Sequence, residues 1–279
     1  MGGEGRWRRV PSGPKVGSRW EAYEGVLEEG LRALGDHRLA GSVEAAMRLC
    51  AEAESRGVAV PEEESKARPS AGGTVWSLTA RTSDGAMWLT PGAGWLRGLW
   101  EYELGVASAK YGVEVLNYCV MSTHWHLLVH DPRGEVSAFT QHVNGQVARA
   151  CNAERERFGP VFERRQVGRT EVLTREGYAA HFAYITANPV SAGLVETASA
   201  WEGAVGLPSQ VGTARVVPRP ALRYYQRSKQ PLEATLAVWP HPDARDVPVE
   251  AVREELTALL TATEALAGAA RRAAVAGTD

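Results

Sequence analysis

An apolar run at residues 118–130, YCVMSTHWHLLVH, carries histidines at alternating positions in its second half. Side chains along a β-strand point alternately to its two faces, so His124, His126 and His130 are expected to share one face. Two neutral imidazoles at this spacing can bind one divalent cation if a third ligand comes from elsewhere. The same spacing fits ordinary strand histidines with hydrogen-bond partners, so the spacing alone leaves both interpretations open.

The surrounding sequence predicts the elements that must position these histidines. Alternating or β-branched segments predict strands at 75–81, at 113–121, from 124 onward and within 164–174. The second and third strands are expected to form a hairpin through Ser122 and Thr123. Apolar residues at helical spacing predict helices from Trp95 to Gly112, over 136–151, and over 175–188, with Pro189 ending the last. This β-α-β-β-α-β-α order predicts an α+β fold with a ferredoxin-like antiparallel sheet and one extra helix.

The two flanks are expected to be extensions of this central part. Within residues 1–70, the sequence predicts a Gly- and Arg-rich tail followed by helices at 20–34 and 42–57. Within residues 204–279, it predicts a loop and a final helix from Val249. The formal net charge is −2, so any surface that binds nucleic acid must be local. Three widely spaced cysteines and the lack of a long apolar run predict a reduced, cytoplasmic protein outside the membrane.

Three blocks of sequence occur in an order that resembles a known family. They are NYCVMSTHWHLLVHDP at 117–132, VNGQVARACNAERERFGPVFERR at 143–165 and AYITANPVSAGLVE at 183–196. Together they resemble the single-tyrosine HUH transposases of the insertion sequence 200-like kind, and within these the REP-associated tyrosine transposases. The resemblance spans residues 74–203, so 71–203 is expected to be the catalytic domain. One departure is that Ser122-Thr123 replaces the Pro-Asn that precedes the first histidine in the family.

The resemblance implies a metal-dependent DNA transposase and endonuclease. His124 and His126 would hold Mg²⁺ or Mn²⁺ at a scissile phosphate of single-stranded or hairpin DNA, and Tyr184 would attack the phosphorus to form a 5′-phosphotyrosine. Because a phenol is a poor nucleophile at neutral pH, it needs a nearby cation. Asn188 is the favoured third ligand, although it could instead cap its helix, and His181 shares the same helical face. Alternatively, Tyr184 could be an ordinary core residue.

Contact with DNA should leave a local excess of positive charge. Residues 133–175 contain eight arginines, no lysine and five glutamates, a local net charge of +3. The expected phosphate contacts are Arg149, Arg164, Arg165 and Arg169, although an arginine run is often only a solvated surface. Trp125 alternates with the histidines and is expected in the core rather than under a DNA base.

Other functions remain compatible with these residues. A domesticated protein of the same fold could bind hairpin DNA without cleaving it. A histidine-triad hydrolase is disfavoured because Leu128 stands where its third histidine would be. Since related enzymes are found as dimers and as monomers, the chain could act as a homodimer, with Tyr184 working in its own subunit or in its neighbour's.

Overall fold

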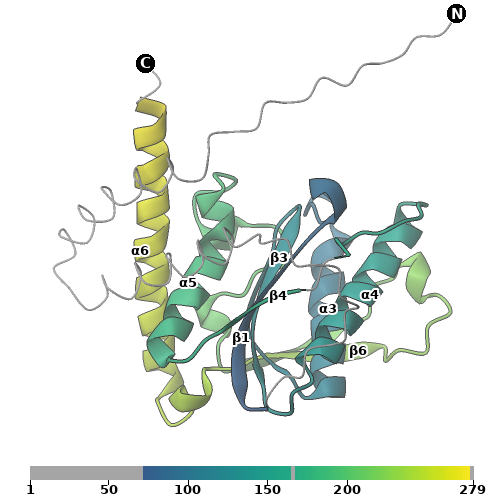
Figure 1. Cartoon of the computed structure of the whole chain (residues 1–279), viewed down its shortest axis with the longest axis horizontal. Coiled ribbons are helices and arrows are strands. Elements are labelled where there is room, and N and C mark those ends of the chain that lie inside the picture. Colours follow the sequence, from purple (N-terminus) through teal and green to yellow (C-terminus); the bar gives the residue numbers. More distant parts are fainter. Residues whose placement is uncertain (1–71, 165–166, 277–279) are drawn as a thin grey trace, which may run out of the picture.

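The computed structural model describes residues 72–164 and 167–276 and has a mixed α+β architecture (Figure 1). One four-stranded antiparallel sheet has the order β2-β3-β1-β4. Its strands are β1 (Thr74–Arg81), β2 (Glu114–Val120), β3 (His124–Asp131) and β4 (Gly168–Glu171). The predicted α+β class with an antiparallel sheet is therefore confirmed. The helices expected at 20–34 and 42–57 lie outside the described residues.

Helices cover both faces of this sheet. One face is covered by α3 (Trp95–Tyr111) and α4 (Val136–Glu154), and the other by α5 (Arg175–Ser191), with α6 (Val249–Ala276) beside α5 (Figure 1). The predicted stop of the first helix is confirmed, because Gly112 has a φ of +67°, a conformation that glycine adopts without strain. No helix within the described ranges is both long and apolar enough to cross a bilayer.

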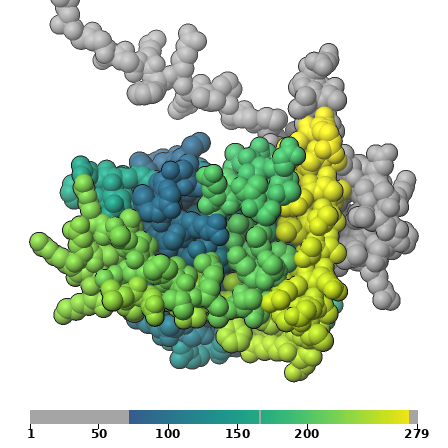
Figure 2. Space-filling model, turned by 180° about the vertical axis from the view of Figure 1, so that it is seen from behind, coloured from purple at the N-terminus to yellow at the C-terminus, as the bar shows by residue number. Residues whose placement is uncertain are grey.

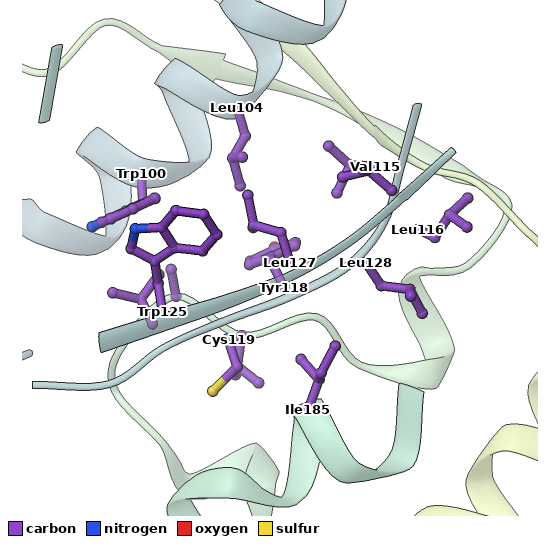
Figure 3. Packing of buried hydrophobic residues seen from close by; sticks show 14 of the residues in the cluster. Trp100, Leu104, Val115, Leu116, Tyr118, Cys119, Trp125, Leu127, Leu128 and Ile185 are labelled. Atoms are coloured by element: carbon purple, nitrogen blue, oxygen red, sulfur yellow. The ribbon is translucent and has the colours of Figure 1, made fainter. Parts of the chain in front are cut away.

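Strand alternation divides the core between the two sheet faces. Figure 3 shows Trp100 and Leu104 of α3 on the same side as Trp125 and Leu127, whereas Cys119 and Leu128 point toward Ile185 of α5. The rings of Trp100 and Trp125 lie 6.0 Å apart between centroids, and both side chains are fully buried. Trp125 is thus a core residue, as its alternation with the histidines predicts.

The β2–β3 hairpin forms despite its Ser122-Thr123 turn. Val120 pairs with Trp125, and the Met121 amide donates to the His124 carbonyl oxygen at 2.8 Å. Thr82 holds the turn from outside, because its amide and its hydroxyl donate to the Thr123 carbonyl oxygen at 2.7 and 2.9 Å. The turn therefore gains from a neighbouring segment the support that glycine or asparagine usually provides.

Pro189 does not end its helix, so the predicted boundary at 188 is wrong. Helix α5 continues to Ser191 with Pro189 inside it. A proline removes one helical hydrogen bond, but only two helical residues follow it here. The next amides still find carbonyls, since Ala192 N–H donates to Asn188 O at 2.9 Å and Leu194 N–H to Pro189 O at 3.0 Å.

The loop expected over 203–221 contains a strand that the sequence did not predict. Strands β5 (Thr213–Pro218) and β6 (Glu233–Val238) pair as a separate antiparallel sheet that packs on α3. Because only Val217 is buried along β5, the strand shows little apolar alternation. Gly105 of α3 permits the close approach, since a Cβ there would lie 3.0 Å from the Thr235 carbonyl oxygen.

Within the described residues, short 3-10 helices lie at Ser83–Gly85, Ala198–Ala200, Pro208–Gln210, Arg223–Tyr225 and Pro242–Ala244. The β5–β6 hairpin and α6 contribute Val217, Leu236 and Leu256 to the same hydrophobic cluster as the central sheet. The described part of 204–279 therefore shares a core with residues 72–203. The predicted division of the chain into three parts stays a prediction.

Candidate active site

His124 and His126 project from β3 on the sheet face that α5 covers. Their ring centroids lie 5.0 Å apart with the ring planes nearly perpendicular. His124 Nδ1 and Thr123 Oγ1 share a hydrogen bond of 3.1 Å. This bond can fix the orientation of the His124 ring and its tautomer.

His126 has the character of a neutral ligand. Its side chain is buried, and its Nε2 atom has no hydrogen-bond partner among the described residues. Burial, followed by the charges of His124, Arg81 and His181, lowers the pKa of His126 to about 3. The ring is therefore neutral at physiological pH, which is the form that binds metals. A buried nitrogen that lacks a partner costs stability, and a bound cation would satisfy it.

Tyr184 of α5 stands beside this histidine pair. Its ring meets the ring of His126 edge-on, with centroids 5.8 Å apart and an interplanar angle of 85°. Tyr184 is half-buried. One chain thus brings together His124 and His126, the predicted metal ligands, and Tyr184, the predicted nucleophile. Their chemical roles stay predictions.

The two proposed third ligands lie on the same helix and differ in environment. The Asn188 side-chain amide donates to the Tyr184 carbonyl oxygen at 3.0 Å, within the last turns of α5. His181 is buried, burial lowers its pKa to about 4, and its charge acts on His126. Among the residues that the structure describes, no group of three or more His, Cys, Asp or Glu side chains is arranged to hold a metal ion.

A buried asparagine fixes α5 against the sheet. Asn117 of β2 is fully buried, and its Nδ2 donates to the Phe182 carbonyl oxygen at 3.0 Å and to Thr186 Oγ1 at 2.9 Å. Thr186 Oγ1 in turn donates to the Gly206 carbonyl oxygen at 3.1 Å. The sequence analysis did not single out Asn117, although an asparagine inside an apolar strand run is a signal, since such a residue is stable only when hydrogen-bonded.

Helix α6 supports α5 from the side opposite the sheet. Arg175 at the start of α5 pairs with Glu255 at 2.5 Å, and Arg271 donates to the Val190 carbonyl oxygen at 2.5 Å near the end. Figure 2 shows α6, in yellow, running along the green surface of α5 and the residues that follow it. The helix that carries Tyr184 is therefore held at both ends.

The predicted DNA-contacting arginines are not brought together around the histidines. Arg149 is exposed, and its Nε donates to Tyr224 Oη at 2.9 Å. Arg169 pairs across from Leu78 and donates to Ser137 Oγ of α4 at 2.8 Å, so it lies on the sheet face opposite the histidines. Arg164 is exposed near the end of β1, and Arg165 lies outside the described residues. Their phosphate contacts stay predictions.

Two other residues, His130 and Arg81, lie on the same sheet face as His124 and His126. His130 Nδ1 lies 2.7 Å from Glu114 Oε2, so it has a carboxylate partner of its own. Arg81 pairs across from His124, which places it on the histidine face, and its charge contributes to the lowered pKa of His126. The sequence analysis missed Arg81, although its place at the end of the strand that pairs with β3 could have indicated it.

Comparisons with known proteins find a structural similarity of limited extent. No family model matches the chain, and no curated protein matches its sequence. Among solved structures, a REP-associated tyrosine transposase bound to a REP hairpin is similar, with a TM-score of 0.41 and 18% sequence identity. The similarity covers 50% of this chain and 80% of that chain.

Proposed function

We propose that the chain cleaves and rejoins single-stranded or hairpin DNA through a covalent 5′-phosphotyrosine intermediate, as an HUH-type tyrosine transposase does. The edge-on contact between His126 and Tyr184 carries this proposal. It places a phenol beside a neutral imidazole whose buried nitrogen lacks a hydrogen-bond partner among the described residues. The three sequence blocks that resemble the REP-associated tyrosine transposases supply the reaction class.

We also assign the sheet to the ferredoxin-like class, since its strand order and antiparallel pairing support this assignment.

His124 and His126 would hold Mg²⁺ or Mn²⁺, with the side-chain oxygen of Asn188 as the proposed third ligand. The bound cation would supply positive charge next to a DNA phosphate. Asn188 follows Tyr184 by one helical turn, so ligand and nucleophile can approach the same phosphate. Since His, Cys, Asp and Glu side chains provide no third ligand in the described residues, water or phosphate oxygens are expected to complete the coordination.

Tyr184 would act as the nucleophile. Its oxygen forms a bond to phosphorus as the bond between phosphorus and the 3′ oxygen breaks, while the phenol loses its proton and the 3′ oxygen gains one. The products are a 5′-phosphotyrosine and a free 3′-hydroxyl group. Attack of another 3′-hydroxyl group on the phosphotyrosine reverses the step and joins two strands. Because Tyr184 and His126 meet within one chain, we propose that Tyr184 acts in its own subunit.

A second function is a hairpin-binding protein of the same fold without cleavage activity. Two observations favour it. The family's Pro-Asn turn is replaced by Ser122-Thr123, and no group of three His, Cys, Asp or Glu ligands is present in the described ranges. Both candidate functions require DNA binding, so only a measurement of bond formation separates them.

The test is to incubate the purified protein with labelled hairpin DNA that has single-stranded flanks and Mn²⁺, and to look for a covalent adduct on a denaturing gel. The adduct should be lost in Tyr184→Phe and in His126→Ala. Tyr111→Phe is the matched control, since Tyr111 is also half-buried and contacts a histidine, His142, on the other side of the sheet. An adduct that survives in Tyr184→Phe would refute the proposed nucleophile. DNA binding without any adduct would favour the second function.

A further inference from the structure

Three segments meet at the end of the sheet where β3 begins. The Ser83 amide donates to the Val161 carbonyl oxygen at 2.9 Å, and the Leu89 amide donates to the Ser122 carbonyl oxygen at 3.0 Å. These bonds connect the segment after β1 with the loop after α4 and with the turn that precedes His124. Side chains on this end of the molecule therefore lie at the end of the sheet where His124 begins β3.

Two arginines of this region lie against two tryptophans. The guanidinium carbon of Arg157 lies 4.1 Å from the ring centroid of Trp88, and that of Arg155 lies 5.4 Å from Trp95 and 5.8 Å from Trp88. Neither arginine has a carboxylate partner among the ion pairs of the described residues. Arg157 Nη1 instead donates to Asn152 Oδ1 at 2.7 Å. Their positive charges thus have no carboxylate partner in the described residues and lie over indole rings.

The next residue, Phe158, is an almost completely exposed aromatic on a fixed loop. Its side chain is 98% exposed. The loop is held by Asn152, whose Nδ2 donates to the Gly159 carbonyl oxygen at 2.9 Å and whose carbonyl oxygen accepts from the Arg157 amide at 3.0 Å. Glu156 adopts a φ of +50°, a strained conformation for a residue other than glycine. These hydrogen bonds hold the loop that carries the exposed ring at a fixed place on the surface.

The geometry points to a stacking platform, made of Trp88, Arg157 and Phe158, that binds unpaired nucleotides of a DNA strand entering the active site. This inference rests on the proposed function for the identity of the strand. Aromatic faces stack on any base, whereas arginine interacts with both bases and phosphates, so this combination is typical of binding to single strands without sequence preference. A single exposed apolar residue is ordinary, but here it directly follows an arginine that has no carboxylate partner in the described residues, at the end of the sheet where His124 begins β3.

The platform can be tested by binding alone. Fluorescence anisotropy of a labelled oligothymidylate is measured with the full chain in EDTA, which prevents cleavage. Phe158→Ala should weaken binding about five- to tenfold, the effect expected for the loss of one stacked base. Phe158→Trp should retain binding. Leu232→Ala is the matched control, since Leu232 is 75% exposed in the loop before β6 and its truncation should change nothing.

Arg157→Gln separates charge from stacking. It should lower the slope of the logarithm of the binding constant against the logarithm of the salt concentration by about one, the effect of one lost phosphate contact. Phe158→Ala should leave this slope unchanged. Thermal melting of each variant checks that the loop change leaves the fold intact.

Equal binding by wild type and Phe158→Ala would overturn the proposed platform. A loss of binding in Leu232→Ala as large as that in Phe158→Ala would also overturn it. The platform and the proposed function can fail separately. Binding that depends on Phe158 without adduct formation would refute only the strand transferase, and adduct formation with unchanged binding by Phe158→Ala would refute only the platform.

Discussion

The imidazole of His126 and the phenol of Tyr184 face each other edge-on, with ring centroids 5.8 Å apart, although they come from a central strand and from a helix much later in the chain. Strand β3 is fixed because it is buried on both faces. Helix α5 is fixed by Asn117 on the sheet side and by α6 on the other. The site therefore depends on how α5 docks as well as on the two side chains.

His126→Ala should weaken Mn²⁺ binding by more than about tenfold, because second-sphere changes alone typically cost ten- to hundredfold and a ligand should cost at least as much. The measurement is titration of the free protein with Mn²⁺, followed by the electron paramagnetic resonance of the unbound ion. His124→Ala should behave in the same way.

His130→Ala is the control for this titration. His130 lies on the same strand and face, but its Nδ1 atom is 2.7 Å from Glu114 Oε2. Its removal should leave Mn²⁺ binding unchanged. Equal losses in all three variants would mean that the strand is disturbed in general, and unchanged binding in His126→Ala would place any metal elsewhere.

Asn117→Ala should lower the free energy of unfolding by about 2–4 kcal/mol, because it leaves buried groups of α5 without hydrogen-bond partners. Urea unfolding measures this effect. Thr186→Val should show part of the loss, since it removes the hydroxyl that links Asn117 to Gly206. Thr186→Ser keeps the hydroxyl and should cost less than Thr186→Val. If Thr186→Ser were the more damaging of the two, packing of the methyl group would outweigh the hydrogen bonds.

Arg81→Gln should weaken DNA binding more than Arg149→Gln does. Arg81 lies on the histidine face opposite His124, whereas Arg149 projects from α4 on the other side of the sheet. Loss of one phosphate contact weakens binding to all sequences and lowers the salt dependence by about one contact. Anisotropy titrations with hairpin DNA at several salt concentrations measure both effects. A larger effect of Arg149→Gln would mean that DNA crosses the α4 side.

Much of the central sheet and its covering helices could be predicted from the sequence because these elements are locally encoded. The strand period of β3 correctly predicted that Trp125 and the histidines lie on opposite faces, because Trp125 meets Trp100 of α3 whereas His126 meets Tyr184 of α5. A positive φ at Gly112 ended α3 where expected. The proximity of Tyr184 to His126 depends on tertiary packing, and it was anticipated only through the family resemblance.

Other features could not be predicted because contacts distant in sequence determine them. Strand β5 is largely exposed and forms because it pairs with β6 and packs on α3. Pro189 stays helical because it comes so near the end of α5 that few bonds are lost. The arginine-rich segment was treated as one surface, yet β4 turns Arg169 toward α4, on the face away from the histidines.

Acidification should destabilise the protein in the absence of metal. The pKa of His126 is lowered to about 3 and that of His181 to about 4, both mainly by burial, against an ordinary value of 6.5. Below pH 6.5 the unfolded state therefore binds protons that the folded state excludes. The free energy of unfolding should fall as the pH drops from 6.5 toward the folded-state values, by at most about 1.4 kcal/mol per pH unit for each histidine.

Melting temperatures measured in EDTA across this pH range test the effect. His126→Asn and His181→Asn should each flatten the dependence of the melting temperature on pH. Unchanged slopes in both variants would show that other groups dominate the acid response.

Leu260→Ala should lower both the stability and the yield of covalent adduct, because Leu260 of α6 is buried in a cluster with Ala187 and Val190 of α5. Truncation of a buried leucine costs about 2–5 kcal/mol, and here the lost contacts are those that hold the helix of Tyr184. Urea unfolding and the adduct assay at a low temperature, where the variant stays folded, measure the two effects. Thr257→Ala on the exposed side of α6 is the control. A full adduct yield from folded Leu260→Ala would mean that the contacts of Leu260 are not needed to position Tyr184.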